Sequence, residues 1–71
     1  MSRYLIVIEE TATGYSAYSP DLPGCVATGQ DRPAVEQTMR EAIAFHIEGL
    51  QAAGEPVPRP VSTSAYVDVA A

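Results

Sequence analysis

The chain has 71 residues, one cysteine and no lysine, and its four arginines stand against nine Asp and Glu for a net charge of −5. This length allows one small domain with a marginal core, and a single cysteine cannot form an internal disulfide, so we expect a homo-oligomer, a dimer or a tetramer. An acidic chain lacks the cations that neutralise phosphates, which argues against direct nucleic-acid binding and favours a basic protein partner.

The N-terminal sequence MSRYLIVIEE holds an apolar run too short for a secretory signal or a membrane span. A lone cysteine also fits a reducing compartment. These features predict a soluble cytoplasmic protein with no membrane partner.

Three short strands are predicted in the first part of the chain. Residues 4–8 are continuously apolar and rich in Ile and Val, which is typical of a strand at a central position in a sheet. Residues 9–14 have the composition of a hairpin connection. Residues 15–19 alternate imperfectly and predict a second strand, and residues 25–29 predict a third.

A single amphipathic helix follows. Asp31 is a good N-cap and Pro33 suits the first turn, where its missing N–H has no cost. Apolar residues recur every three or four positions from residue 35 to residue 50. The helix is expected to end near Ala53, with Gly54 as the glycine just beyond it.

The last part of the chain predicts a connector and a fourth strand. The sequence EPVPRP at residues 55–60 cannot continue a helix. Residues 62–70 then alternate in the manner of a strand. The order β-β-β-α-β predicts one α+β domain over residues 1–71, in which the helix covers one face of the sheet. The other face has no second helix to cover it and is where we expect a partner.

The sequence SPDLPGC at residues 19–25 predicts a stiff loop between two strands. Pro20 and Pro23 lower the entropy of the loop, and Gly24 permits a backbone angle that other residues avoid. Asp21 has two interpretations. The favoured one is a turn residue whose carboxylate accepts backbone N–H bonds, and the alternative is an exposed ligand or general base.

Few other residues suggest chemistry. His46 lies within the apolar stripe of the helix, where packing is favoured over a role as general base. Cys25 is predicted to be a small buried hydrophobe, and Phe45 suits a core or a subunit interface equally. Glu9 and Glu10 have no companion acid within the first strand. No catalytic residue, metal site or cofactor is predicted.

Two blocks of sequence, YSAYSPDLPGCVATGQD and REAIAFHIEGLQAAGEPVPRP, resemble the HicB family of antitoxin-like proteins. The likeness covers residues 4 to about 60, and the two blocks in this order make it specific. It implies a partial RNase H-like fold of three antiparallel strands, a helix and a further strand. It also implies a partner, a small basic HicA-like toxin that cleaves mRNA and has a double-stranded-RNA-binding-domain-like fold.

The resemblance has limits. Members of this family usually carry a C-terminal DNA-binding segment, whereas this sequence stops at Ala71 after the predicted strand and shows no basic segment. Operator binding and a C-terminal DNA-binding domain are therefore not expected here. The first strand also lacks the carboxylates of a nuclease, and a shared fold does not carry function.

The sequence thus favours a non-enzymatic protein–protein interaction module that neutralises a toxin. Acidic groups would pair with the cationic face of the toxin and apolar groups would anchor the contact. The candidate residues for partner binding are Glu9, Glu10, Tyr15, Tyr18, Asp21 and Leu22. Two alternatives remain at this point: a small metal-dependent nuclease or other hydrolase using Asp21 and His46, and an orphan homo-oligomeric domain with another partner.

Overall fold

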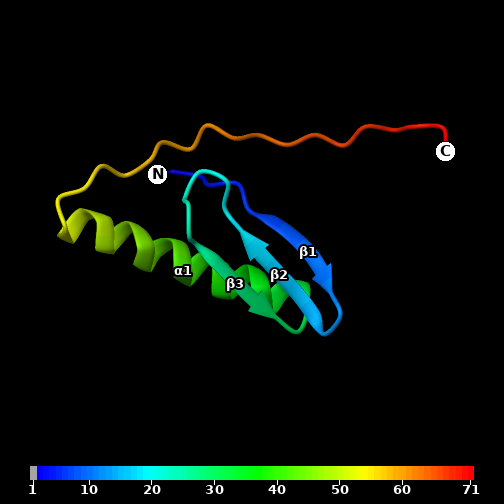
Figure 1. Cartoon of the computed structure of the whole chain (residues 1–71), viewed down its shortest axis with the longest axis horizontal. Coiled ribbons are helices and arrows are strands. Elements are labelled where there is room, and N and C mark those ends of the chain that lie inside the picture. Colours follow the sequence, from blue (N-terminus) through cyan, green and yellow to red (C-terminus); the bar gives the residue numbers. More distant parts are fainter. Residues whose placement is uncertain (1) are drawn as a thin grey trace.

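A computed structural model describes residues 2–71 of the chain. Strands β1 (Val7–Thr11), β2 (Gly14–Tyr18) and β3 (Val26–Gly29) form an antiparallel sheet in the order β1-β2-β3. Helix α1 (Arg32–Ala52) follows and packs along the sheet (Figure 1). The predicted α+β class and the order of these four elements are confirmed.

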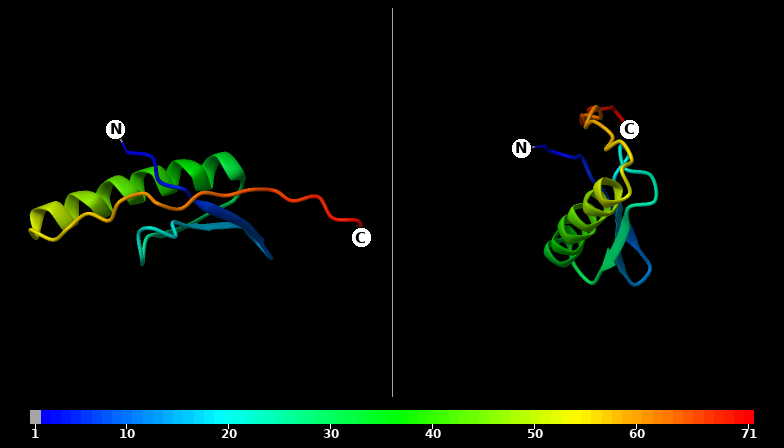
Figure 2. Two further views of the ribbon diagram at one scale, coloured as in Figure 1. Left: turned by 90° about the horizontal axis from the view of Figure 1, so that it is seen from above. Right: turned by 90° about the vertical axis from the view of Figure 1, so that its left-hand side faces the viewer.

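The sheet and the helix form two layers, which the end-on view in Figure 2 separates clearly. Cross-strand partners share a face of a sheet, so the row Ile8, Ala17 and Ala27 lies on one side. Both alanines are buried with residues of α1, which places this row under the helix. The buried apolar residues of the core are Ala17, Leu22, Cys25, Ala27, Val35 and Met39.

The first strand lies three residues later than its apolar run suggested. Residues 9–11 pair with β2 around the two-residue turn Ala12–Thr13, although their composition predicted a connection. Pairing across a tight turn outweighs the low strand propensity of two glutamates. Residues 4–6 form no strand, and Tyr4 and Ile6 pack against the core.

Both ends of α1 are capped as the sequence predicted. Asp31 Oδ1 accepts a hydrogen bond from the backbone N of Ala34 at 2.8 Å. At the other end, Gly54 has a φ of +71° and the N–H of Glu55 donates to Leu50 O, which is the 6→1 bond of a Schellman motif. These caps satisfy backbone groups that the helix itself leaves free.

The two halves of α1 have different surroundings. Val35 and Met39, both in the first half, are completely buried. In the second half, His46 and Leu50 remain half-buried, and Phe45 is 78% exposed. The structure therefore places Phe45 outside the core. No helix among the described residues combines the length and the hydrophobicity that crossing a membrane needs.

The predicted fourth strand is absent, and this prediction was wrong. Residues 55–71, which we call the tail, are extended but belong to no strand of the described chain. The tail passes the start of the chain and continues beyond it, along the longest dimension of the molecule, 48 Å (Figure 1). An alternating sequence forms a strand only where a neighbouring strand accepts its backbone hydrogen bonds.

Candidate partner-binding face

The loop SPDLPGC folds into two consecutive turns. The N–H of Leu22 donates to Ser19 O at 3.2 Å, and the N–H of Cys25 donates to Leu22 O at 3.1 Å. Each proline occupies the second position of its turn, which its fixed φ favours. Gly24, at the third position of the second turn, has a φ of +83°, the value that a type II turn requires. The sequence P-D-L-P-G-C therefore encodes two consecutive β-turns.

The turns direct Leu22 into the protein. The N–H of Ser19 donates to Cys25 O at 3.3 Å, which closes the loop, and Ser19 Oγ donates to Leu5 O at 3.0 Å, which ties it to the start of the chain. Leu22 then has no exposed surface. The hypothesis that Leu22 anchors a partner needs correction, because its side chain already fills the core.

Asp21 holds the tail. Its Oδ2 accepts hydrogen bonds from the backbone N of Val61 at 3.2 Å and of Ser62 at 3.0 Å, and its Oδ1 accepts one from Ser62 Oγ at 2.8 Å. The backbone bond from Ser62, followed by its hydroxyl bond, lowers the pKa of Asp21 below its ordinary value of 3.8. The carboxylate thus accepts backbone N–H groups, as the favoured interpretation required, but from a segment forty residues away.

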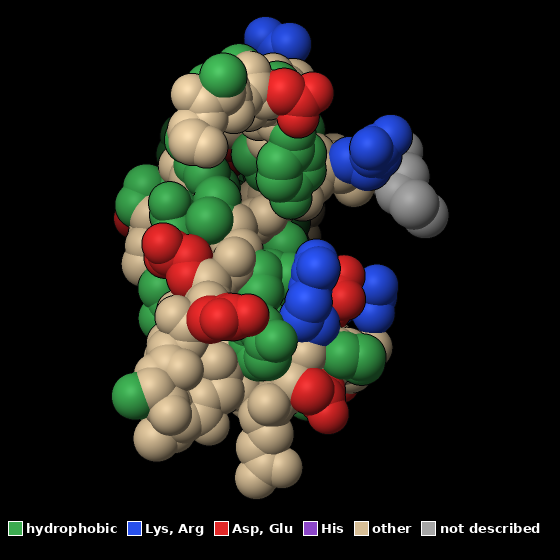
Figure 3. Space-filling view, turned by 90° about the vertical axis from the view of Figure 1, so that its right-hand side faces the viewer, with side chains coloured by type: hydrophobic (Ala, Val, Ile, Leu, Met, Phe, Trp, Pro, Cys, Tyr) green, Lys and Arg blue, Asp and Glu red, His purple; other side chains and the backbone are tan. Residues whose placement is uncertain are grey.

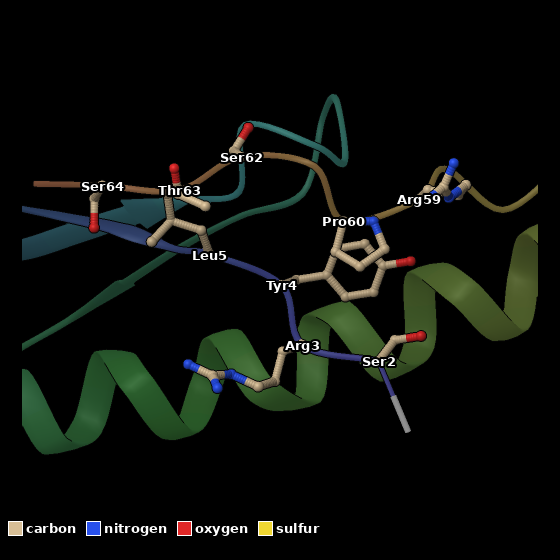
Figure 4. A pocket seen from close by; sticks show the side chains of 9 residues that line it. All are labelled: Ser2, Arg3, Tyr4, Leu5, Arg59, Pro60, Ser62, Thr63 and Ser64. Carbon is tan, nitrogen blue, oxygen red and sulfur yellow. The ribbon is translucent and has the colours of Figure 1, made fainter.

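A second contact fixes the tail next to the start of the chain. Tyr4 Oη donates to Pro58 O at 2.6 Å, and the ring of Tyr4 lies beside Pro60 (Figure 4). A hollow of about 800 Å³ lies between residues 2–5 and residues 59–64. The tail is therefore held at residues 58–62.

The sheet face opposite α1 carries an apolar row across all three strands. Val7 pairs with Tyr18, and Tyr18 pairs with Val26. Tyr18 and Val26 are exposed, Val26 by 66%. The row was missed at Val7 and Val26, because the sequence alone does not fix the register. We call the row Val7, Tyr18 and Val26 together with Glu9 the open face.

The six predicted partner-binding residues do not all share this face. Glu9 pairs with Ser16 and lies next to the apolar row, on the same side as Tyr18. Glu10 pairs with Tyr15 on the helix side, where Tyr15 packs against the core. Figure 3 shows acidic side chains beside hydrophobic ones at this end of the molecule, with basic side chains interspersed among other acidic ones.

The residues of the hydrolase alternative are not brought together. His46 and Cys25 line a hollow of about 410 Å³ beside α1, and Asp21 is not among the residues that line it. Burial raises the pKa of the Cys25 thiol, which disfavours the reactive thiolate. Within residues 2–71, no group of three His, Cys, Asp or Glu side chains is placed to hold a metal ion.

Comparison with known proteins decides the family. The family model described as HicB_like antitoxin of bacterial toxin-antitoxin system matches residues 4–70. The chain belongs to the HicB-like antitoxin family. Among its relatives, an uncharacterized 14.9 kDa protein of Haemophilus phage HP1 is 35% identical over 65 residues. That match covers 92% of this chain but 49% of the phage protein, so this HicB-like chain spans about half of that relative's length.

Other relatives are of similar size to this chain. A UPF0150 protein of Synechocystis is 39% identical over 58 residues, covering 80% of this chain and 73% of that protein. Among solved structures, a chain of the HicA3 and HicB3 toxin-antitoxin complex is 37% identical. It has a TM-score of 0.73 and the match covers 84% of this chain and 70% of that one. The resemblance that the two sequence blocks suggested is confirmed.

Proposed function

We propose that this HicB-like chain is a non-enzymatic antitoxin module that binds and masks a small, basic, mRNA-cleaving toxin of the HicA type. The observation that carries the proposal is the 37% identity and the TM-score of 0.73 to a chain of a HicA3 and HicB3 complex. The family match over residues 4–70 supports the same role. Because the target of such a toxin is mRNA, we place the activity in the cytoplasm.

The open face is the surface that we assign to the toxin. Its row of Val7, Tyr18 and Val26 offers an apolar centre, and aromatic residues contribute strongly to binding at interface centres. Glu9 lies at its border, and Glu10 adds a second exposed carboxylate on the same strand. A net charge of −5 would accelerate the encounter with a cationic protein.

Masking in this scheme needs no chemistry from the chain. A ribonuclease must reach the RNA backbone with cationic groups, and an acidic partner seated on those groups occupies the position of the phosphates. Tyr18 would desolvate the contact, Glu9 would pair with toxin cations at its border, and Glu10, on the other face of the same strand, would add longer-range attraction. Asp21 is bonded to the tail, so its part in toxin binding is indirect, by holding the tail in place.

The test compares two charge-matched double variants. We expect E9Q/E10Q to weaken binding to a purified HicA-type toxin about tenfold or more and to flatten its salt dependence, because border charges act through long-range attraction. E48Q/E55Q removes the same charge from exposed positions of α1 and of the chain after it, and should bind like the wild type. The measurements are calorimetric titration over a range of salt concentrations and protection of mRNA from cleavage.

A second pair of variants tests the apolar row. Tyr18→Ala should weaken binding more than Phe45→Ala, although Phe45 is the more exposed of the two. Equal loss in both variants would place the toxin elsewhere. If the wild-type chain neither binds the toxin nor protects mRNA, the antitoxin proposal fails.

A further inference from the structure

We infer that the end of the tail, residues 63–70, forms the missing fourth strand in a second copy of this chain, where it pairs with the outer edge of β1. In a symmetric dimer, each copy would donate its tail to the other. The inference concerns self-association alone and does not rest on toxin binding.

The tail is presented as a strand without a neighbour. Its start is fixed by Tyr4 at Pro58 and by Asp21 at Val61 and Ser62. Beyond Ser62, no hydrogen bond joins the tail to the rest of the described chain. Val67 is 79% exposed, and the alternating side chains around it are exposed too. An extended apolar segment with free backbone groups is a template for pairing with another chain.

The outer edge of β1 likewise has backbone N–H and C=O groups without a neighbouring strand. Thr11 and Gly14 flank a two-residue turn, so they must exchange both of their backbone hydrogen bonds. The alternation of an antiparallel ladder then directs the N–H and C=O of Glu10 and Ile8 away from β2. The continuous apolar run before Glu9 is typical of a strand with neighbours on both sides, yet β1 lies at an edge of the sheet.

The tail of the same copy does not supply this neighbour. After Ser62, the tail continues beyond the sheet, whereas β1 diverges from it (Figures 1 and 2). The eight extended residues 63–70 reach about 26 Å, which exceeds the length of the five-residue strand β1. A second copy can therefore receive the tail along the whole edge without disturbing the contacts that hold residues 58–62.

β3 is the competing edge, and it is the poorer one. It has four residues against five in β1, and it ends at Gly29, two residues before the N-cap Asp31. In a dimer in which each copy donates its tail, the contact between tail and β1 would form twice. The additional apolar burial would stabilise a domain whose own core is small.

The experiment uses proline to block one edge at a time. Glu10→Pro removes an outward N–H of β1 and leaves the bonds to β2 intact. Thr28→Pro is its matched control. In the β2–β3 ladder, Ala27 and Gly29 exchange backbone hydrogen bonds with β2, whereas the N–H of Thr28 points away from β2 to the free edge of β3. Val67→Pro removes a donor within the tail, which has no contact to lose in a single copy. Self-association is measured by sedimentation equilibrium, and folding by circular dichroism.

We expect the wild type and T28P to dimerise with similar affinity, and E10P and V67P to raise the dissociation constant at least tenfold while keeping the helical signal. A wild type that stays monomeric at high concentration would overturn the inference. So would a dimer that T28P abolishes and E10P does not. No toxin is present in any arm, so failure here leaves the antitoxin proposal standing, and the converse also holds.

Discussion

The loop SPDLPGC and the tail are both irregular, proline-containing segments, but they are held in different ways. The loop is closed by its own backbone hydrogen bonds and directs Leu22 into the core. The tail has no such closure, and beyond Glu55, which belongs to the helix cap, its described hydrogen bonds end on two side chains of the body, Tyr4 and Asp21. Local turn chemistry therefore fixes the loop, whereas contacts distant in sequence fix the tail.

This difference explains which segment is complete within one chain. The N–H groups of Ser19, Leu22 and Cys25 are all bonded to carbonyl groups within the loop. The tail leaves its backbone groups free from residue 63 onward and keeps its apolar side chains exposed. Substitutions in the loop should therefore alter the stability of the body, and substitutions at the tail contacts should alter the position of the tail.

The largest effect is expected from Leu22→Ala. Removing a fully buried leucine loses apolar burial and leaves a cavity, at a cost of about 2–5 kcal/mol in the free energy of unfolding. Phe45→Ala removes a larger but exposed side chain and should change stability by less than about 0.5 kcal/mol. Urea denaturation monitored by circular dichroism measures both. Equal losses would mean that Leu22 is not the core residue that the loop positions.

A smaller change in the free energy of unfolding is expected from two glycine substitutions, one of which should destabilise the protein and the other stabilise it. Gly24→Ala places a Cβ at a φ of +83° and should cost about 1–2 kcal/mol. Gly49→Ala, inside α1 with open space around the new Cβ, should stabilise the protein by about 0.5–1 kcal/mol. Thermal unfolding of both variants measures the difference. A destabilising Gly49→Ala would instead show that close packing at this position of α1 requires glycine.

Much of the body could be predicted because its signals are local. The helix caps at Asp31 and Gly54 and the angle of Gly24 follow from short sequence patterns. The register of the open face did not follow, because it depends on which residues meet across the strands. The burial of Leu22 was missed for a similar reason, since it depends on how the turns on either side of Leu22 direct its side chain toward the core. The prediction of a fourth strand failed because a strand forms only beside a neighbouring strand, and the sequence of the segment alone does not show whether a neighbour is present.

The smallest effect concerns Asp21, whose loss should release the tail and leave the body folded. Asp21→Asn weakens the bonds to Val61 and Ser62, so the amide resonances of these two residues should shift toward values typical of unstructured chain, with the core resonances unchanged. Asp68→Asn removes the same charge from the tail and should leave the Val61 and Ser62 resonances in place. Two-dimensional NMR of labelled protein detects both outcomes.

Acidification should have the same effect as the Asp21 variant. Because the tail contact lowers the pKa of Asp21, its contribution is fully present above the ordinary value of 3.8 and is lost as the pH falls through the lowered pKa. The Val61 and Ser62 amides should therefore titrate together below pH 3.8, and the Asp21→Asn variant should lack this transition. A transition that persists in the variant would assign the acid sensitivity to another carboxylate, and the tail would then be held mainly by Tyr4.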